Sequence, residues 1–174
     1  MKARLSYEDS CRMLQGVYLD HDSIPPMPTG RPGAKDSGPM GVSFFRTFVG
    51  GDLSDLTLPR TFFGRSEIDD AQFRNTDFSE STLSWNDFTS VDFTDAVLAR
   101  CDLRASAFTD VKFMRADLRG SDMRWSTFEN CSFTKALMRD SILTFKQGIE
   151  LNLSPEQREQ IAWTNDQGPE PEGG

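Results

Sequence analysis

A large apolar side chain recurs at every fifth position through more than half of the chain. The series starts at residue 48 and reads Phe48, Leu53, Leu58, Phe63, Ile68, Phe73, Phe78, Leu83, Phe88, Phe93, Leu98, Leu103, Phe108, Phe113, Leu118, Met123, Phe128, Phe133, Met138 and Leu143. An amphipathic helix repeats its apolar residues every three or four positions and a strand every two, so a period of five fits neither. Unbroken periodicity of this kind indicates a tandem repeat in which each unit packs against its neighbours.

A second column of mostly small residues runs two positions ahead of the large ones. From residue 66 onward it reads Ser66, Ala71, Thr76, Ser81, Asn86, Val91, Ala96, Cys101, Ser106, Val111, Ala116, Ser121, Ser126, Cys131, Ala136 and Ser141. Each five-residue unit is therefore expected to turn one small and one large side chain inward and three side chains outward. Cys101 and Cys131 belong to the small column, where a thiol behaves as a small hydrophobic group.

A longer period of twenty residues is superimposed on the period of five. Phenylalanine recurs at Phe73, Phe93, Phe113 and Phe133 and again at Phe88, Phe108 and Phe128, whereas Leu or Met occupies the other two sets. If four units form one turn of a solenoid, like side chains stack on one another from coil to coil, and phenylalanine rings can offset-stack. A helical bundle has no reason to sort its residues in this way.

The repeating unit resembles the A(D/N)LXX consensus of the pentapeptide repeat family. Examples are Ala116-Asp117-Leu118-Arg119-Gly120 and Thr76-Asp77-Phe78-Ser79-Glu80, and the resemblance is strong over residues 66–145 and loose over 46–65. It implies an all-β fold, a right-handed quadrilateral parallel β-helix, whose coils stack about 4.8 Å apart. We therefore expect a pentapeptide repeat solenoid at residues 46–145.

Both ends of such a solenoid need a cap, because open strand edges invite other chains. Residues 1–45 lack the repeat and are expected to form an N-terminal cap, with a short helix or leading strand at 5–19 and a Pro/Gly-rich loop at 24–41. Leu56 is too large for the small inward column, which predicts an irregular first coil.

The C-terminal cap is expected at residues 146–163 and includes a short helix. Ser154 suits the N-cap, Pro155 suits the first helical position and Gln157 completes a capping box. The apolar residues expected to cover the last coil are Leu151, Leu153, Ile161 and Trp163. Residues 164–174 are expected to form a disordered acidic tail.

Composition argues against several classes of function. The formal net charge of −8 does not suit direct binding to nucleic acid, and no apolar run approaches the length of a membrane span. The N-terminus lacks the apolar core of a secretory signal, which favours a cytoplasmic protein. His21 is the single histidine, and the three cysteines, Cys11 included, form no CxxC pair, so we expect no metal and no cofactor.

The outward residues are where a function must be sought, since the inward ones form the core. Two positions after one set of large residues lie Arg65, Trp85, Ala105, Trp125 and Phe145. Aligned exposed aromatic side chains are typical of partner sites, which suggests a protein-binding scaffold contacting its partner through Arg65, Trp85, Trp125 and Phe145. The alternative is that these rings lie flat on the coil or are covered by the N-terminal loop.

A second hypothesis is DNA mimicry. One face carries only acidic charge, from Glu67, Asp69, Asp70, Asp87, Asp110 and Glu129. The family resemblance implies this option, because some pentapeptide repeat proteins resemble duplex DNA in width and charge and bind DNA gyrase or topoisomerase IV. Those members generally dimerise through apolar C-terminal segments, whereas this C-terminus is polar, and the oligomeric state stays open. Catalysis is not expected, because paired carboxylates on a convex wall lack a cleft that would shift their pKa.

Overall fold

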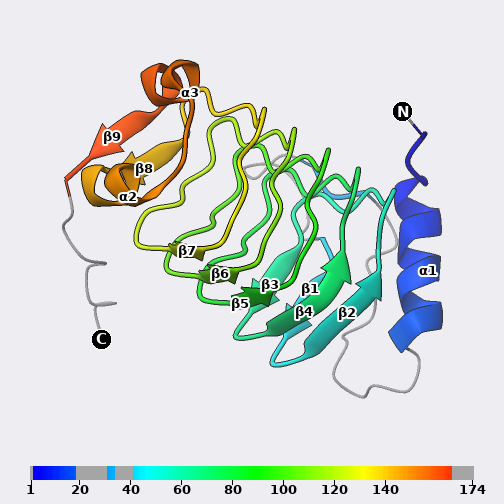
Figure 1. Ribbon diagram of the computed structural model, residues 1–174. Helices are drawn as coiled ribbons and strands as arrows, with labels where there is room; N and C mark the ends of the chain where they lie inside the picture. Colours follow the sequence, from blue (N-terminus) through cyan, green and yellow to red (C-terminus); the bar gives the residue numbers. More distant parts are fainter. Residues whose placement is uncertain (1, 19–30, 34–40, 166–174) are drawn as a thin grey trace.

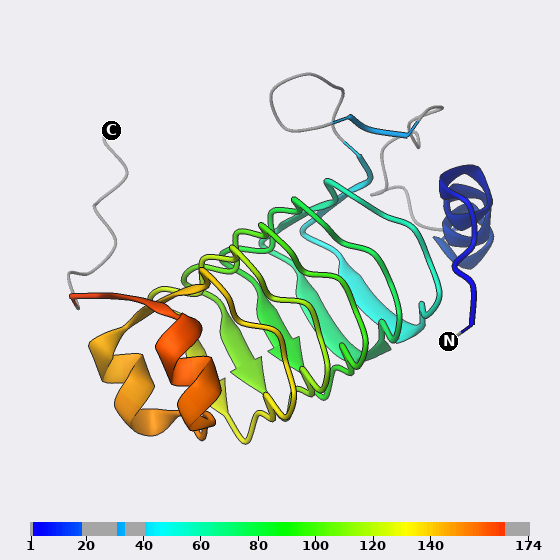
Figure 2. The same ribbon diagram turned by 90° about the horizontal axis from the view of Figure 1, so that it is seen from above.

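The computed structural model describes residues 2–18, 31–33 and 41–165. These residues form a stack of four-sided coils, with helix α1 (Tyr7–Tyr18) at one end and helices α2 (Phe145–Glu150) and α3 (Pro155–Gln160) at the other (Figure 1). The view from above shows the coils following one another in a single row (Figure 2). The pentapeptide repeat β-helix that the sequence predicts is therefore present.

Every strand pairs in parallel with a strand of the neighbouring coil. One face holds a five-stranded sheet in the order β2 (Phe48–Asp52), β4 (Glu67–Gln72), β5 (Asp87–Thr89), β6 (Ala107–Thr109) and β7 (Thr127–Glu129). A second face holds the pair β1 (Ser43–Phe45) and β3 (Phe62–Gly64) at its start, and the pair β8 (Ile142–Thr144) and β9 (Ala162–Thr164) at its end. Isolated bridges between residues twenty positions apart complete the remaining walls, as in Asp77 to Val97.

The inward columns form the core. From residue 53 to 143 every large residue of the five-residue series is buried except Phe128, which is partly buried. Phenylalanine rings stack from coil to coil, with centroids 4.8 Å apart for Phe88 and Phe108 and 5.0 Å apart for Phe113 and Phe133. Interplanar angles of 9° and 10° show that these rings are nearly parallel. The twenty-residue period thus reflects the stacking of like rings.

The small column is buried as well, apart from the half-buried Cys131, and its hydroxyl groups bond to the backbone. Ser106 donates from Oγ to the carbonyl of Leu83, and its own N–H donates to Ser126 Oγ. Asn86 is the larger exception in this column, and its side chain accepts from the N–H of Ser66 and donates to the carbonyl of Phe63. Buried polar groups in the column therefore have partners, which removes most of the cost of burying them.

The first coil corrects the sequence interpretation at its start. Phe48, expected to point inward, is 59% exposed, and the buried residue is Val49, paired with Ile68. Strand β2 has one residue fewer than β4 between its paired positions, so the register shifts between Val49 and Gly51. Gly51 has a φ of +86°, which glycine adopts at little cost.

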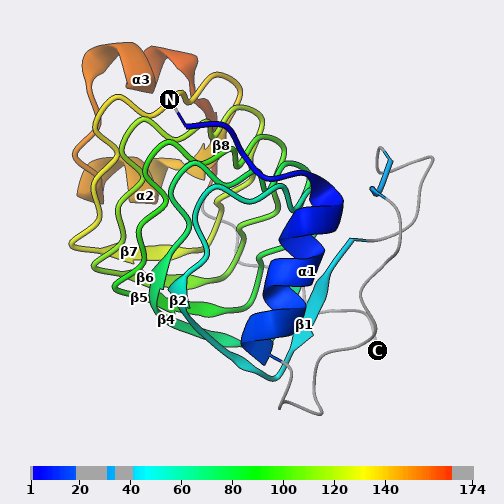
Figure 3. The same cartoon turned by 90° about the vertical axis from the view of Figure 1, so that its right-hand side faces the viewer.

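Helix α1 covers this end of the stack (Figure 3). Its apolar face buries Tyr7, Cys11 and Leu14, which agrees with the helix expected at 5–19. Ser10 Oγ accepts from the N–H of Thr57, and Leu56 is fully buried in the small column, as the irregular first coil requires. Of the expected loop at 24–41, residues 24–30 and 34–40 lie outside the described part of the chain.

The C-terminal cap contains one helix more than expected. Helix α3 has the predicted N-cap at Ser154 and capping box with Gln157. Helix α2 begins at Phe145 and repeats the same device, with Thr144 as N-cap and Gln147 as its partner. Leu151, Leu153 and Ile161 are buried against the last coil and Trp163 is partly buried, as predicted. Thr164, expected to open the disordered tail, instead belongs to β9, and residues 166–174 of that tail lie outside the described part of the chain.

Candidate protein-binding surface

The chain turns each corner of the solenoid through a residue in the left-handed backbone region. Eighteen non-glycine residues of the described chain have positive φ, and from Asp55 to Asp140 they recur at nearly every fifth position. Most are Asp, Asn, Arg or Ser, but two are tryptophans, Trp85 and Trp125, each with φ of +61°. Only Gly and, less often, Asn or Asp adopt this region routinely, so the tryptophans are costly choices for a corner.

Trp85 and Trp125 lie on the same corner. The N–H of Trp85 donates to the carbonyl of Arg104 in the next coil, and the N–H of Ala105 donates to that of Arg124. The corner therefore presents Arg65, Trp85, Ala105 and Trp125 in one line, which we call the aromatic corner. Trp85 is 56% exposed, so the structure does not leave it flat and buried on the coil.

Trp125 is more shielded than Trp85. It is half-buried, and the guanidinium of Arg124 lies 4.8 Å from its ring centroid. A cation over an indole face is attracted by the ring quadrupole. Trp85 is therefore the more accessible of the two indoles.

An ion-pair ladder runs beside the aromatic corner. Arg104 and Arg124 bind the carboxylates of Asp102 and Asp122 at 2.8 and 2.7 Å. These hydrogen bonds raise the pKa of both arginines. Arg104 also lies 3.9 Å from Asp122 of the next coil, so the ladder is a neutral network that holds its side chains in place.

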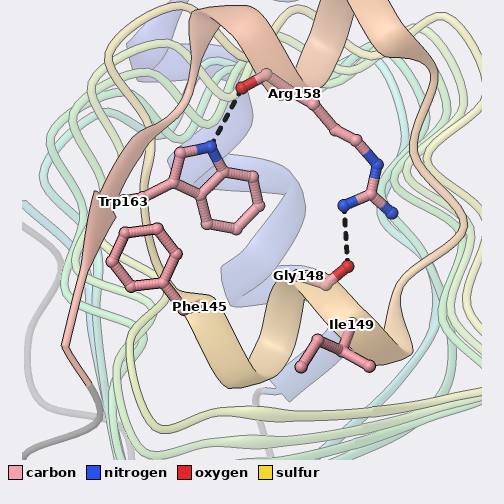
Figure 4. Close-up of a pocket in the computed structure, with 5 residues that line it drawn as sticks. All are labelled: Phe145, Gly148, Ile149, Arg158 and Trp163. Carbon is pink, nitrogen blue, oxygen red and sulfur yellow. Dashed lines mark hydrogen bonds between the residues drawn. The ribbon is translucent and has the colours of Figure 1, made fainter.

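Phe145 leaves the line of the corner. It opens α2 and its ring stacks on Trp163, with centroids 6.1 Å apart and an interplanar angle of 17°. These two rings line a pocket of about 330 Å³ together with Gly148, Ile149 and Arg158 (Figure 4). The structure thus brings Arg65, Trp85 and Trp125 together and places the 57% exposed Phe145 in a separate C-terminal patch.

Two further exposed rings, Phe45 and Phe48, were not predicted from the sequence. Phe45 is 46% exposed with the guanidinium of Arg46 5.2 Å from its centroid, and the exposed Phe48 lies on the other side of the same turn. Arg46 precedes Arg65 on the corner, because Phe45 pairs with Gly64. The register shift lies at the Gly50-Gly51 dipeptide, where β2 is one residue shorter than β4.

The acidic residues lie where the sequence places them, on the five-stranded sheet and its edge. Glu67, Asp69, Asp70, Asp87, Asp110 and Glu129 are all exposed. Glu67 lies beside Asp87 in the register, and Asn130 donates to Asp110. Within residues 2–18, 31–33 and 41–165 no ion pair involves any of these six carboxylates.

The described residues hold no cluster of metal-binding side chains. Cys11 and Cys101 are buried, Cys131 is half-buried, and burial raises the pKa of Cys11 and Cys131, which disfavours a reactive thiolate. His21 lies outside the described residues. No helix in the described part of the chain is both long and apolar enough to cross a membrane.

A family model described as pentapeptide repeats matches the chain in eight copies, over residues 66–104, 87–124 and 108–144. The repeat region belongs to the pentapeptide repeat family. No curated protein sequence was found to match the chain.

The solved structure of one pentapeptide repeat protein, HetL, shares the fold. HetL, involved in heterocyst differentiation regulation in the cyanobacterium Nostoc sp. strain PCC 7120, superposes with a TM-score of 0.56 at 14% identity, over 58% of this chain and 48% of HetL. This chain therefore spans about half the length of HetL. A protein of the Arabidopsis thaliana thylakoid lumen gives a TM-score of 0.46 at 23% identity, covering 65% of this chain and 72% of that one. Trypsin-treated QnrB1, a plasmid-mediated fluoroquinolone resistance protein, gives 0.45 at 15% identity, covering 72% and 74%. At 14% identity the likeness to HetL concerns the fold alone.

Proposed function

We propose that this pentapeptide repeat protein is a non-enzymatic protein-binding module and that the aromatic corner is its contact surface. The observation that carries the proposal is Trp85, 56% exposed at a left-handed corner position. A left-handed conformation costs an ordinary residue about 1–2 kcal/mol, and large exposed aromatic residues are the common anchors of interfaces. Other corners of the solenoid are turned by Arg, Ser, Asp or Ala at similar φ, so the corner conformation alone does not call for an indole, and a contact with a partner gives it a role.

The rest of the surface supports a binding role. The rigid core holds the corner, and the Asp102–Arg104–Asp122–Arg124 ladder supplies a polar rim beside the rings. An apolar centre with a polar rim is the usual anatomy of an interface.

The test is partner capture with variants matched for backbone conformation. Trp85→Asn and Trp125→Asn place a residue that tolerates left-handed φ at the corner, so folding should be retained while partner capture is lost. Lys135→Asn is the control, because Lys135 is an exposed corner residue at φ +57° on a different corner. Unchanged capture by both tryptophan variants would remove the aromatic corner from the proposal.

A second candidate is DNA mimicry with gyrase as the target, and the acidic face favours it. The six exposed carboxylates lie on one face without ion pairs among the described residues, which is compatible with a surface that imitates phosphates. If this candidate is right, the protein inhibits gyrase supercoiling, and changing Asp69, Asp70, Asp87 and Asp110 to Lys abolishes the inhibition. Full gyrase activity at saturating protein would exclude it.

A further inference from the structure

We propose that the aromatic corner binds a proline-rich segment of a partner protein in the polyproline II conformation, with acidic residues at the end nearest Arg65. This inference rests on the proposed function, because it names the chemistry of the partner for the same surface. The segment would lie along the solenoid axis, over Trp85, Ala105 and Trp125.

The spacing of the two indoles is the first argument. Trp85 and Trp125 are two coils apart, which is about 9.6 Å along the axis at the usual interstrand spacing. A polyproline II helix has three residues per turn and rises about 3.1 Å per residue, so equivalent side chains recur about every 9.3 Å. A strand repeats its side chains about every 6.7 Å and an α-helix about every 5.4 Å, so neither matches one indole per repeat as closely.

Backbone hydrogen bonding is the second argument. The N–H groups of Trp85 and Ala105 already donate to the next coil, so the corner cannot add a strand through these donors. A polyproline II segment makes no internal hydrogen bonds and needs no such donors. The indole Nε1–H of Trp85 has no hydrogen-bond partner within the described residues, and it can donate to a carbonyl of the segment.

The shape of the corner suits proline rings. Ala105 is half-buried and small, so its side chain adds little bulk between the corner positions of Trp85 and Trp125. Proline-rich segments dock on aromatic-lined surfaces of this kind with little loss of conformational entropy. Trp85, the more exposed indole, is the principal anchor.

The charges around the aromatic corner determine where the acidic end of the segment lies. Arg104 and Arg124 are held by Asp102 and Asp122, so they offer little free charge. The exposed Arg65 and Arg46 lie beyond Trp85 at the N-terminal end of the corner, and no carboxylate of the described residues forms an ion pair with either. Glu67 and the other acidic residues lie across the corner on the next face. An acidic residue of the partner therefore fits at Arg65, on the side away from Glu67.

The experiment titrates the full-length protein with the synthetic peptide EPLPPLPEE and follows tryptophan fluorescence. Saturable binding in the micromolar to sub-millimolar range is expected. Trp85→Asn should weaken it at least tenfold, and Arg65→Glu should weaken it severalfold. The variant Lys135→Asn, matched in backbone conformation, should leave it unchanged. A second peptide with every proline replaced by alanine should bind at least tenfold more weakly.

The outcomes separate the two proposals. If partner capture depends on Trp85 but neither peptide binds up to about 1 mM, the polyproline inference is wrong and the proposed function stands. Equal binding of the proline and alanine peptides also overturns the inference. If capture does not depend on Trp85, the proposed function fails whatever the peptides do.

The chain itself contains two competing segments, the proline-rich stretch Ile24, Pro25, Pro26, Met27 and Pro28 and the C-terminal tail. Residues 164–174 include Pro169, Glu170, Pro171 and Glu172. If Pro169→Gly with Pro171→Gly in the full-length protein makes the peptide bind many times more tightly, the chain's own tail is the occupant and the assignment to a partner protein is overturned. Pro25→Gly with Pro26→Gly and Pro28→Gly tests the N-terminal stretch in the same way, and unchanged affinity in both variants supports the partner.

Discussion

Gln147 and Gln157 carry the strongest prediction about stability, because each closes the end of one core column with its side chain. Gln147 Nε2 donates to the carbonyls of Met123 and Ser126, both at 2.8 Å, while Oε1 accepts from the N–H of Thr144 at 2.8 Å. Gln157 does the same for Phe133, Ala136 and Ser154. The two glutamines therefore satisfy backbone groups that a further coil would otherwise satisfy.

Gln147→Met keeps the approximate volume of the side chain and removes all three hydrogen bonds. A buried polar group left without a partner costs about 1–3 kcal/mol. The summed cost of three such groups is an upper limit on the loss of stability. The actual loss should be well below it, because water can reach the end of a solenoid and bond to the freed groups. We expect a loss of about 2–4 kcal/mol for Gln147→Met, and a similar loss for Gln157→Met, from these bonds.

The assay is urea unfolding followed by circular dichroism, with the slope of the transition checked for constancy. Gln160→Met is the matched control, since Gln160 is the exposed last residue of α3 and should change stability by less than about 0.5 kcal/mol. Equal midpoints for Gln147→Met and Gln160→Met would refute the view that the glutamines close the core columns.

Three other predictions follow from the core, the first coil and the surface ion pairs. Phe108→Ala removes a ring stacked on both sides and should cost about 3–5 kcal/mol in urea unfolding; a near-parental midpoint would contradict the ring stack. In thermal melts Phe48→Ser should be nearly neutral, whereas Val49→Ser should be clearly destabilising. The reverse order would mean that Phe48, and not Val49, points inward, as the five-residue period predicts. Arg115 lowers the pKa of Asp95 through a hydrogen bond. The stability that the Asp95–Arg115 pair contributes is therefore fully present above the unfolded pKa of Asp95, about 4, and is lost as the pH falls through its lower folded pKa. Arg115→Ala should therefore lower the melting temperature at pH 7 and have little effect at pH 2, and an equal effect at both would argue against the pair.

The sequence was sufficient for the solenoid because its information is local and repeated. Each unit places one small and one large residue inward, so a single pattern read at Ala116-Asp117-Leu118 determines every coil from 66 onward. The capping box at Ser154 was equally predictable from the sequence, because the two residues that it pairs, Ser154 and Gln157, are only three positions apart. The aromatic corner also followed from the period of twenty, which puts Trp85 and Trp125 in one line without reference to any other part of the chain.

Only the tertiary structure decided what happens where the repeat stops. The shift that exposes Phe48 and buries Val49 depends on pairing with β4, because the local period alone gives no reason to skip a residue. Phe145 occupies the position that the repeat predicts for the aromatic corner, but it begins α2. The repeat ends here because the side chain of Gln147 donates to the carbonyls of Met123 and Ser126, which lie more than twenty residues earlier. The exposure of Trp85 likewise depends on neighbouring coils and not on its own unit. Periodicity fixes which side chains stack, whereas ends and exposed surfaces depend on contacts between residues distant in the chain.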